Sequence, residues 1–519
     1  MIFRNYYSDT TVCRLPSTIS APIHRIRRSR CVLPALAASL ILLTLALGCV
    51  TPPASAPSRE DAQPDAGALD RRLPEADAED GEDGAGPSGA IAGAASADAI
   101  AARLRPETAE VRDFTPPAPE SPTEHYRRRR DAAVARIVDA MTVEEKVGQL
   151  IVPGLGDIAG PGVQRNTEAV AAFLRRVQPG GVLFFTENIH TPDQVRNLIR
   201  DLQGQSTLPL LIAIDEEGGV VSRLTRNPDM PATEIPSARR IGATGDVSLA
   251  YDLARVTGLE LRALGFNMNF APVADVLTNP ANQVIGSRSY GTDGETVSRF
   301  VDAVVRGLES AGISPVLKHY PGHGDTAGDT HAGPVIMAHD LARLRAVELA
   351  PFRAGIQAGA PAVMTGHIAL PAVTGNSEAA TFSPALVDDL LRGDIGFQGL
   401  VISDALTMGA VTTRYAPEEA AIRALEAGVD VLLRPVDPAE VHTAVIEAVH
   451  SGRLSVDRID RSVTRILRLK VDYGILVPDD EVFRARAATR PSPEPDVVGS
   501  EAHRQIVRRV QDALEERPR

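Results

Sequence analysis

The fold and the chemistry of this chain meet in residues 313–331, which read Ile313-Ser314-Pro315-Val316-Leu317-Lys318-His319-Tyr320-Pro321-Gly322-His323-Gly324-Asp325-Thr326-Ala327-Gly328-Asp329-Thr330-His331. The first five residues form an apolar run typical of a buried strand. The stretch from residue 318 onward holds three His, two Asp, one Lys and three Gly. Glycine and proline permit sharp turns, and histidine exchanges protons near neutral pH. One such His would be explained by a local hydrogen bond on a polar surface loop, but this density predicts a functional loop.

Apolar runs of this kind recur from about residue 125 onward, with helix-like segments between most of them. Eight runs are strand candidates: 150–152, 181–185, 208–214, 267–273, 313–317, 362–365, 400–403 and 429–433. Helical periodicity is clearest in 142–150, 191–202, 247–263, 296–311, 341–358 and 417–427. This alternation predicts an α/β fold, a (β/α)8 barrel of the TIM type that forms a single catalytic domain. A doubly wound open sheet is the alternative, and residues 146–152 could also continue the helix before them.

Polar side chains follow six of the eight runs within one or two residues. They are Asp215, Asp275, Lys318 with His319, His367, Asp404 and Arg434. In a parallel barrel the carboxyl ends of all strands converge on one face, where active sites are built. The sequence therefore predicts an active site at that face.

The order Lys-His-Tyr-Pro-Gly-His-Gly, four residues, then Asp-Thr-His in residues 318–331 resembles the signature of family 3 glycoside hydrolases. The likeness is to the β-N-acetylhexosaminidase branch, which acts on bacterial cell-wall sugars, and it extends over roughly residues 125–475. It implies a retaining exo-β-N-acetylglucosaminidase that acts on peptidoglycan fragments and needs no metal or organic cofactor. A β-glucosidase or another β-glycosidase of the same family is the nearest alternative.

The resemblance also implies the roles of three catalytic residues. Asp404 matches the nucleophile, although an Asp after a strand could otherwise cap the next helix. His331 matches the acid/base and Asp329 the carboxylate that orients it, and an ordinary pKa of ~6.5 suits a His to proton transfer. The family commonly has a second Asp where this chain has Ala405.

Five more residues match sugar-binding positions of the family: Asp215, Arg223, Arg288, Lys318 and His319. Each could instead have a structural role, such as a surface ion pair or a Lys whose stem packs on apolar surface. Arg223 and Arg288 rest on the resemblance alone, because no pattern singles them out.

Two other classes of protein are compatible with parts of the same loop. His319 and His323, with the neighbouring Asp residues and His331, could bind a metal ion in a metal-dependent hydrolase. Lys318 would then place a positive charge beside the cation, which argues against a metal. A non-catalytic sugar-binding lipoprotein of the cell envelope would have no need of Asp404, Asp329 and His331 together.

Residues 1–49 are predicted to be an export signal. Four arginines between residues 25 and 30 precede the uncharged apolar run 32–48, which is short for a membrane span. The run ends Leu45-Ala46-Leu47-Gly48-Cys49 and resembles the lipobox of bacterial lipoproteins, although Ala46 stands where Leu is commonest. We therefore expect a lipid on Cys49 and an anchor in a bacterial membrane, facing the periplasm or the exterior. An ordinary signal peptide or an uncleaved anchor is the alternative.

The rest of the chain divides by composition into a linker, a catalytic domain and a tail. Residues 50–123 contain 15 acidic residues against 6 Arg and few aromatics, which predicts a disordered acidic linker. The catalytic domain is predicted for 124–475, and 476–519 form a tail with one helix candidate at 501–516. The net charge of −13 argues against nucleic acid as a partner. The cysteines are Cys13, Cys31 and Cys49, so the chain beyond them can form neither a disulfide nor a Cys-based metal site.

Overall fold

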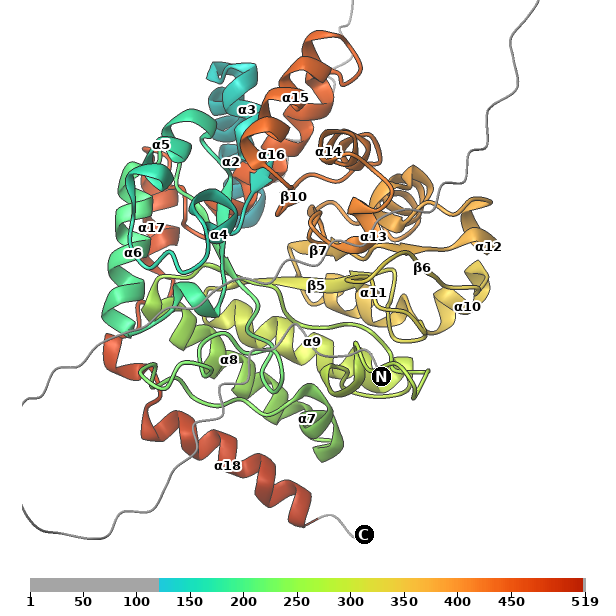
Figure 1. Cartoon of the computed structure of the whole chain (residues 1–519). Coiled ribbons are helices and arrows are strands. Elements are labelled where there is room, and N and C mark those ends of the chain that lie inside the picture. The colour runs from blue at the N-terminus through green and yellow to red at the C-terminus, as the bar shows by residue number, and fades with distance from the viewer. Residues whose placement is uncertain (1–120, 517–519) are drawn as a thin grey trace, which may run out of the picture. The chain divides into compact units, whose positions relative to one another are not determined.

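A computed structural model describes residues 121–516 of the chain. The predicted signal, Cys49 and nearly all of the predicted linker lie outside this part. Within it the chain forms an α/β fold, in which a curled parallel sheet lies at the centre and helices lie around it (Figure 1).

Six parallel strands form the main sheet, in the order β2-β3-β4-β5-β7-β9. They are β2 (Gly181–Phe184), β3 (Leu211–Ile214), β4 (Met268–Asn269), β5 (Ser314–Tyr320), β7 (Ala362–Thr365) and β9 (Leu400–Ser403). β1 (Ile151–Val152) and β10 (Leu432–Leu433) form a separate parallel pair. Backbone hydrogen bonds join this pair to both edges of the main sheet: Leu183 N–H donates to the Pro153 carbonyl, and Ser403 N–H donates to the Val431 carbonyl, each over 2.9 Å.

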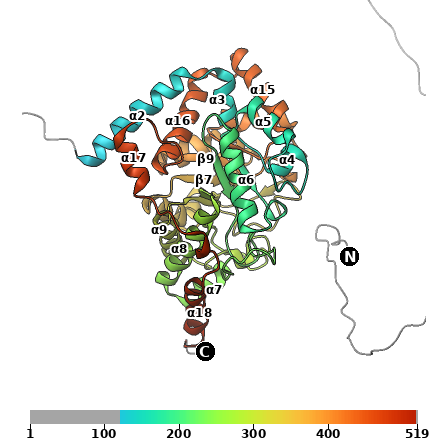
Figure 2. The ribbon, with the colours of Figure 1, turned by 90° about the vertical axis from the view of Figure 1, so that its left-hand side faces the viewer.

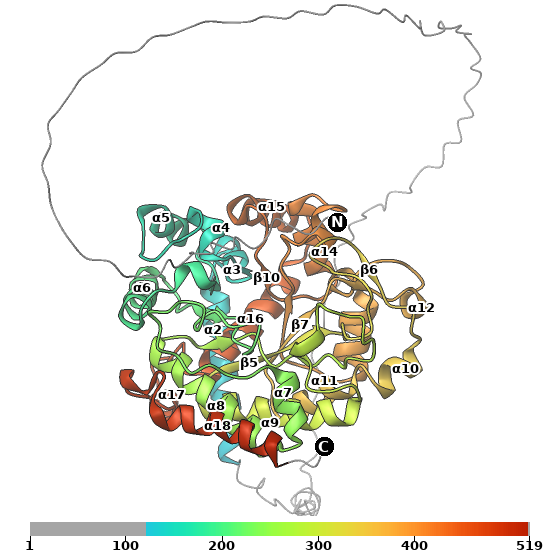
Figure 3. The same cartoon turned by 60° about the horizontal axis from the view of Figure 1, so that its bottom comes forward.

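Each predicted apolar run thus overlaps a strand, and every residue of the eight strands is buried. The strands of a parallel sheet that is covered on both faces are buried on both sides. Their sequences are therefore continuous apolar runs and do not alternate between apolar and polar residues. Figure 3 shows the helices on the outer side of these strands.

Several of the helices that alternate with the strands begin at capping residues that the sequence supplies. Ser, Thr or Asp side chains accept backbone N–H groups at the starts of α6, α8 and α9, among others. The helices are α2 (Pro122–Ala140), α3 (Val143–Gln149), α4 (Leu155–Ala159), α5 (Glu168–Val177), α6 (Pro192–Gln205), α7 (Ala238–Thr244), α8 (Val247–Leu264), α9 (Gly294–Ser310), α10 (Leu341–Ala346), α11 (Ala350–Gln357), α12 (Pro371–Thr374), α13 (Gly409–Thr412), α14 (Pro417–Glu426), α15 (Pro438–His450), α16 (Val456–Asp472), α17 (Glu481–Ala488) and α18 (Glu501–Glu515). Between β7 and β9 the helical position is taken by a π-helix, η4 (Ala385–Asp394).

Three details differ from the sequence prediction or resolve it. The single helix predicted for 341–358 is two helices, α10 and α11, because Pro351 has no N–H to continue the helical ladder. α3 ends at Gln149, so residues 151–152 are a strand and do not continue the helix. Two short strands were not predicted: β6 (Val335–Ile336) and β8 (Ile368–Ala369) pair with each other in the connections that follow β5 and β7.

The segments at both ends of the described chain pack on the sheet-and-helix body. Arg130 of α2 pairs with Asp472 of α16 over 2.6 Å, and the Tyr126 ring contacts Phe483 of α17 edge-on. α18 packs along α7 and α8, as Figure 2 shows. No helix between residues 121 and 516 has the length and apolar character needed to cross a bilayer.

Candidate active site

The predicted site residues lie at the carboxyl ends of the strands, as expected. Asp215 follows β3 and Asp404 follows β9, whereas Lys318 and His319 lie inside β5, which runs three residues further than its apolar run. Asp329 and His331 lie in the connection after β5. Arg288 belongs to a short 3-10 turn, η2 (Gly286–Arg288), after β4, and Arg223 lies in the connection after β3.

The ammonium group of Lys318 is the centre of the predicted sugar-binding residues. Its side chain is 2% exposed, and Nζ lies 2.6 Å from Asp215 Oδ1 and 2.7 Å from Glu217 Oε1. Burial opposes ionisation of both carboxyl groups, but the nearby cations outweigh it and hold the pKa of each below its ordinary value. Both carboxyl groups are therefore ionised at neutral pH, where they accept hydrogen bonds.

Arg288 and His319 extend this cluster. Arg288 forms two parallel 2.8 Å bonds to the Glu217 carboxylate, and its Nη2 lies 3.4 Å from His319 Nε2. His319 Nδ1 lies 2.8 Å from Asp275 Oδ2, so the Asp275 carboxylate accepts a hydrogen bond from the ring N–H and orients the ring. Asp275 also accepts the backbone N–H of His319 and of His323, and it therefore fixes the backbone at the end of β5.

Arg223 is placed by an aromatic ring and a buried carboxyl group. Its guanidinium lies 5.3 Å from the centroid of Phe185, and its Nη2 lies 3.5 Å from Asp215. Glu216 accepts the backbone N–H of Arg223 over 2.7 Å and that of Leu224 over 3.1 Å. Nε of Arg223 is buried and has no hydrogen-bond partner among the described residues.

The same ring holds a second guanidinium at the end of β10. Arg434 lies 4.7 Å from the Phe185 centroid and forms bonds of 2.9 and 2.7 Å to Asp157. Its φ of +45° is uncommon for a residue other than glycine. Each of the cations described on this face thus lies beside a carboxylate. Charges that balance in this way suit a ligand whose hydroxyl groups are neutral.

Asp404 lies at the end of β9 in a histidine-rich environment. Burial would raise the pKa of its carboxyl group, but His319, the Ala405 N–H and His331 lower it below the ordinary value. The Ala405 N–H donates to Asp404 Oδ1 over 2.8 Å, and the Asp404 N–H donates to the Thr365 carbonyl. Asp404 is therefore an ionised carboxylate fixed to the end of the sheet.

Asp329 and His331 form a pair at the open side of the site. His331 Nδ1 lies 2.8 Å from Asp329 Oδ1, and the side chains are 70% and 46% exposed. Gly409 and Ala410, at the start of α13, donate their N–H groups to the carbonyls of His331 and Thr330 over 3.1 Å each. A Cβ at Gly409 would lie 2.6 Å from the His331 carbonyl oxygen, so this approach requires glycine. The segment after Asp404 therefore also supports the His331 loop.

The structure adds residues to the site that the sequence reasoning did not assign. Glu217 bridges Lys318 and Arg288, and only its place in an acidic run beside Asp215 could have signalled it. Asp275 and His367 had been noted at strand ends without a role. His367 is buried, with Nδ1 2.9 Å from Thr381 Oγ1, and burial lowers the pKa of its ring. Phe185 gave no signal in the sequence.

The histidines considered as metal ligands have other partners. His323 is buried with Nδ1 2.6 Å from Thr326 Oγ1, and burial lowers its pKa. Between residues 121 and 516, no group of three or more His, Cys, Asp or Glu side chains is arranged to hold a metal ion.

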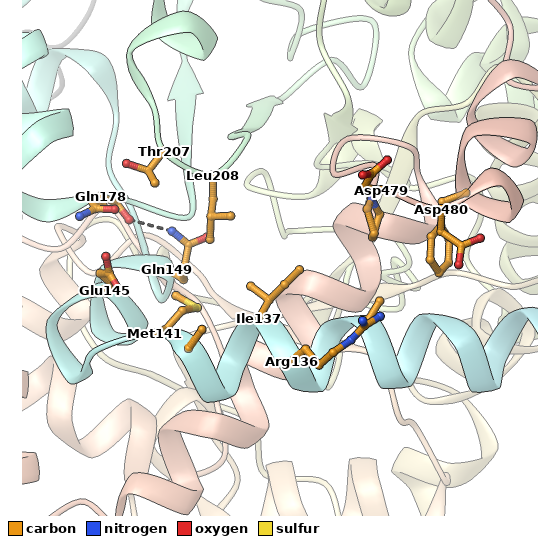
Figure 4. A pocket seen from close by; sticks show the side chains of 14 residues that line it. Arg136, Ile137, Met141, Glu145, Gln149, Gln178, Thr207, Leu208, Asp479 and Asp480 are labelled. Carbon is orange, nitrogen blue, oxygen red and sulfur yellow. Dashed lines mark hydrogen bonds between the residues drawn. The ribbon is translucent and has the colours of Figure 1, made fainter.

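A separate pocket of about 500 Å³ lies between α2, α3 and the segment before α17 (Figure 4). Gln149, which precedes β1, and Leu208, which precedes β3, line it together with Ile137 and Met141. These residues come before strands, whereas the predicted site residues lie at the opposite, carboxyl ends. The pocket therefore holds none of the candidate active-site residues.

Comparisons with known proteins agree with this geometry. Residues 142–469 match the model of the "Glycosyl hydrolase family 3 N terminal domain". The chain is 37% identical to beta-hexosaminidase LpqI of Mycobacterium tuberculosis over 347 residues, which cover 65% of this chain and 85% of that protein. It is 36% identical to beta-hexosaminidase A of Pseudoalteromonas piscicida over 330 residues, which are 58% of this chain but only 54% of that protein. Among solved structures, a family 3 beta-N-acetylglucosaminidase from a Paenibacillus species aligns with a TM-score of 0.65 and 38% identity, covering 72% of this chain and 69% of the other.

The buried ion pairs around Lys318 should make the free energy of unfolding depend on pH in the acid range. The pKa of Glu217 is lower in the folded state than its ordinary value of ~4.3. The contribution of Glu217 to the free energy of unfolding is therefore complete above that ordinary value, and it is lost as the pH falls toward the folded-state pKa. Glu217→Gln should therefore lower the free energy of unfolding by about 3–5 kcal/mol at pH 7, the loss typical of breaking a buried pair. The difference from the wild type should shrink as the pH falls below about 4, measured by denaturant unfolding.

Asp302→Asn is the matched control, because Asp302 forms an exposed pair with Arg306 on α9. Exposed pairs contribute less than about 1 kcal/mol, so this variant should unfold nearly as the wild type does. A Glu217→Gln deficit that stays constant with pH would show that the carboxylate charge is not its origin.

Proposed function

The chain belongs to glycosyl hydrolase family 3, and we propose that it is an exo-acting β-N-acetylglucosaminidase that retains the anomeric configuration. One observation carries the proposal: Asp404 and the Asp329–His331 pair lie on the same face as a charge-balanced cluster of sugar-binding type. The hexosaminidases and the acetylglucosaminidase to which the chain is similar support the same activity.

In the first step, the ionised Asp404 attacks the anomeric carbon of the terminal sugar. His331 protonates the departing glycosidic oxygen as the bond to the anomeric carbon breaks, and Asp329 stabilises the charged ring beforehand. The products are a covalent sugar–Asp404 ester and the free leaving group. Asp215, Arg223, Lys318, His319 and Arg288 hold the sugar by its hydroxyl and acetamido groups.

In the second step, water replaces the leaving group. His331, now neutral, takes a proton from the water as its oxygen attacks the anomeric carbon, and the ester bond to Asp404 breaks. The sugar leaves with its original configuration, Asp404 is again a carboxylate and His331 again carries its proton. The 70% exposure of His331 gives the water access to this proton acceptor.

The strands that carry these residues form, on our proposal, a complete (β/α)8 barrel. The hydrogen bonds that join the β1–β10 pair to both edges of the six-stranded sheet support a closed ring. In such a ring all eight carboxyl ends face a common site.

The natural substrates that we propose are peptidoglycan fragments with a terminal β-linked N-acetylglucosamine. An exported enzyme would meet them in the cell envelope, and the predicted signal sequence would take it there. A pocket that hydrogen-bonds an acetamido group leaves buried polar groups unpaired when that group is missing.

A panel of aryl β-glycosides tests the activity. The N-acetylglucosaminide should exceed the glucoside in kcat/KM by roughly a hundredfold, because the acetamido contacts are made only by the former. Comparable rates would point to a broad β-glycosidase. Loss of activity in EDTA, restored by zinc, would favour a metal-dependent hydrolase.

Asp404 is expected to carry the covalent intermediate. A slowly turned over fluorinated substrate should leave a sugar on the peptide that contains Asp404, as identified by mass analysis, and Asp404→Ala should abolish turnover while the protein stays folded. A label on another carboxylate would reject the assignment.

His331→Ala should slow substrates with poor leaving groups far more than activated aryl glycosides. Proton donation contributes about 10²–10⁴-fold where the leaving group needs it and little where it does not. The rates are compared across phenols of different acidity. A uniform loss would remove His331 from the acid role.

Cys49 is proposed to be acylated, with the enzyme anchored in a bacterial membrane. Cys49→Ser should release the protein from the membrane fraction or block its processing, because the mature lipidated terminus cannot form. Fractionation and electrophoretic mobility measure this. Unchanged retention and mobility would favour an uncleaved anchor.

A further inference from the structure

Glu260 of α8 is a buried carboxyl group that joins the C-terminal segment to the rest of the chain. It is 2% exposed and accepts four hydrogen bonds. Two come from Thr233, through its backbone N–H over 2.9 Å and its hydroxyl over 2.5 Å. The other two come from the Gly499 N–H over 2.9 Å and from His503 Nδ1 over 2.8 Å. Gly499 precedes α18 and His503 lies in its first turn, beyond the matched family residues 142–469.

Gly499 also contacts the same region through its backbone. Its φ is +64°, and a Cβ there would lie 1.6 Å from the carbonyl oxygen of Pro231. No side chain other than hydrogen can take this place without moving one of the two segments. The C-terminal segment is thus closely fitted against residues 231–233.

Residues 231–233 belong to the β3–α7 connection (residues 215–237), which also holds the predicted sugar-binding residues Asp215 and Arg223. Inside it, the Gly219 N–H donates to the Ile235 carbonyl over 2.9 Å. A Cβ at Gly219 would lie 2.6 Å from the Cβ of Ser237, so these two parts of the connection are in direct contact. The turn 217–221 that contains Gly219 separates Asp215 from Arg223.

We propose that the segment 499–516 holds the β3–α7 connection in its sugar-binding shape, with His503 as the positioning residue. Hydrogen bonds run from His503 to Glu260 and from Glu260 to Thr233. Two residues further along the chain, Ile235 is bonded to Gly219 in the turn between Asp215 and Arg223. His503 touches no substrate; it keeps the Glu260 carboxylate bonded and so keeps Thr233 in place. The inference rests on the proposed function, since it assigns this connection to sugar binding.

The experiment compares His503→Ala, His503→Gln and Thr233→Val in the full chain. His503→Ala should raise KM for an aryl glycoside and Kd for free N-acetylglucosamine about tenfold, with kcat within about twofold, because it loosens ground-state sugar contacts and leaves Asp404 and His331 untouched. Thr233→Val, which removes only the hydroxyl donor, should act in the same direction. His503→Gln should restore both values, since its amide can donate to Glu260.

Arg509→Ala is the control on the same helix, because Arg509 pairs only at the surface, with Asp252 of α8. It should leave KM and kcat unchanged. The inference is overturned if His503→Ala keeps the wild-type KM and Kd, if Gln does not rescue it, or if Arg509→Ala has the same effect. The kinetics use whichever aryl glycoside the wild type cleaves best, so a wild type inactive on N-acetylglucosaminides rejects the proposed function and still tests the inference.

Discussion

The buried ammonium group of Lys318 is the charge on which the proposed sugar-binding half of the site depends. A cation with 2% exposure has lost its hydration, and only close anions can compensate for that loss. Asp215 and Glu217 supply them, and the second carboxylate in turn binds Arg288 through two bonds. The result is a set of ionised groups held in fixed directions, ready to exchange hydrogen bonds with hydroxyl groups without prior rearrangement.

The two groups that we propose to be catalytic are held in different ways. Asp404 is attached to the end of β9, and its backbone is bonded to the neighbouring strand at Thr365. His331 lies on an exposed loop, and its position depends on Asp329 and on the backbone N–H groups of Gly409 and Ala410. Because these donors follow Asp404 by only five and six residues, one segment of chain determines the position of Asp404 and supports the loop that carries His331.

Residues away from the strand ends are also held in place by neighbouring side chains. Arg223 has a backbone fixed by Glu216 and a guanidinium set against Phe185, which also receives Arg434. Burial raises the pKa of Glu216 to about 7, which reflects how completely this carboxyl group is enclosed. Near the other end of the β3–α7 connection, Glu260 accepts hydrogen bonds from Thr233 and from His503 of α18. The β3–α7 connection, which holds the proposed sugar-binding residues Asp215 and Arg223, is thus hydrogen-bonded on both sides by buried carboxyl groups.

The eight strands could be predicted from the amino-acid sequence, because each contains a continuous apolar run and most of these runs are separated by helical segments, and so could the residues that follow them, such as Asp404 and Asp215. The sequence also pointed to Asp329 and His331, whose spacing is local. Which side chains meet became clear from the folded arrangement: Glu217 contacts Lys318 and Arg288, Asp275 contacts His319, and Phe185 contacts two arginines. These partners lie on different strands and connections, so no pattern along the chain encodes their contacts. The split of 341–358 and the β6–β8 pair also escaped prediction, since the first depends on one missing N–H and the second on a pairing between distant loops.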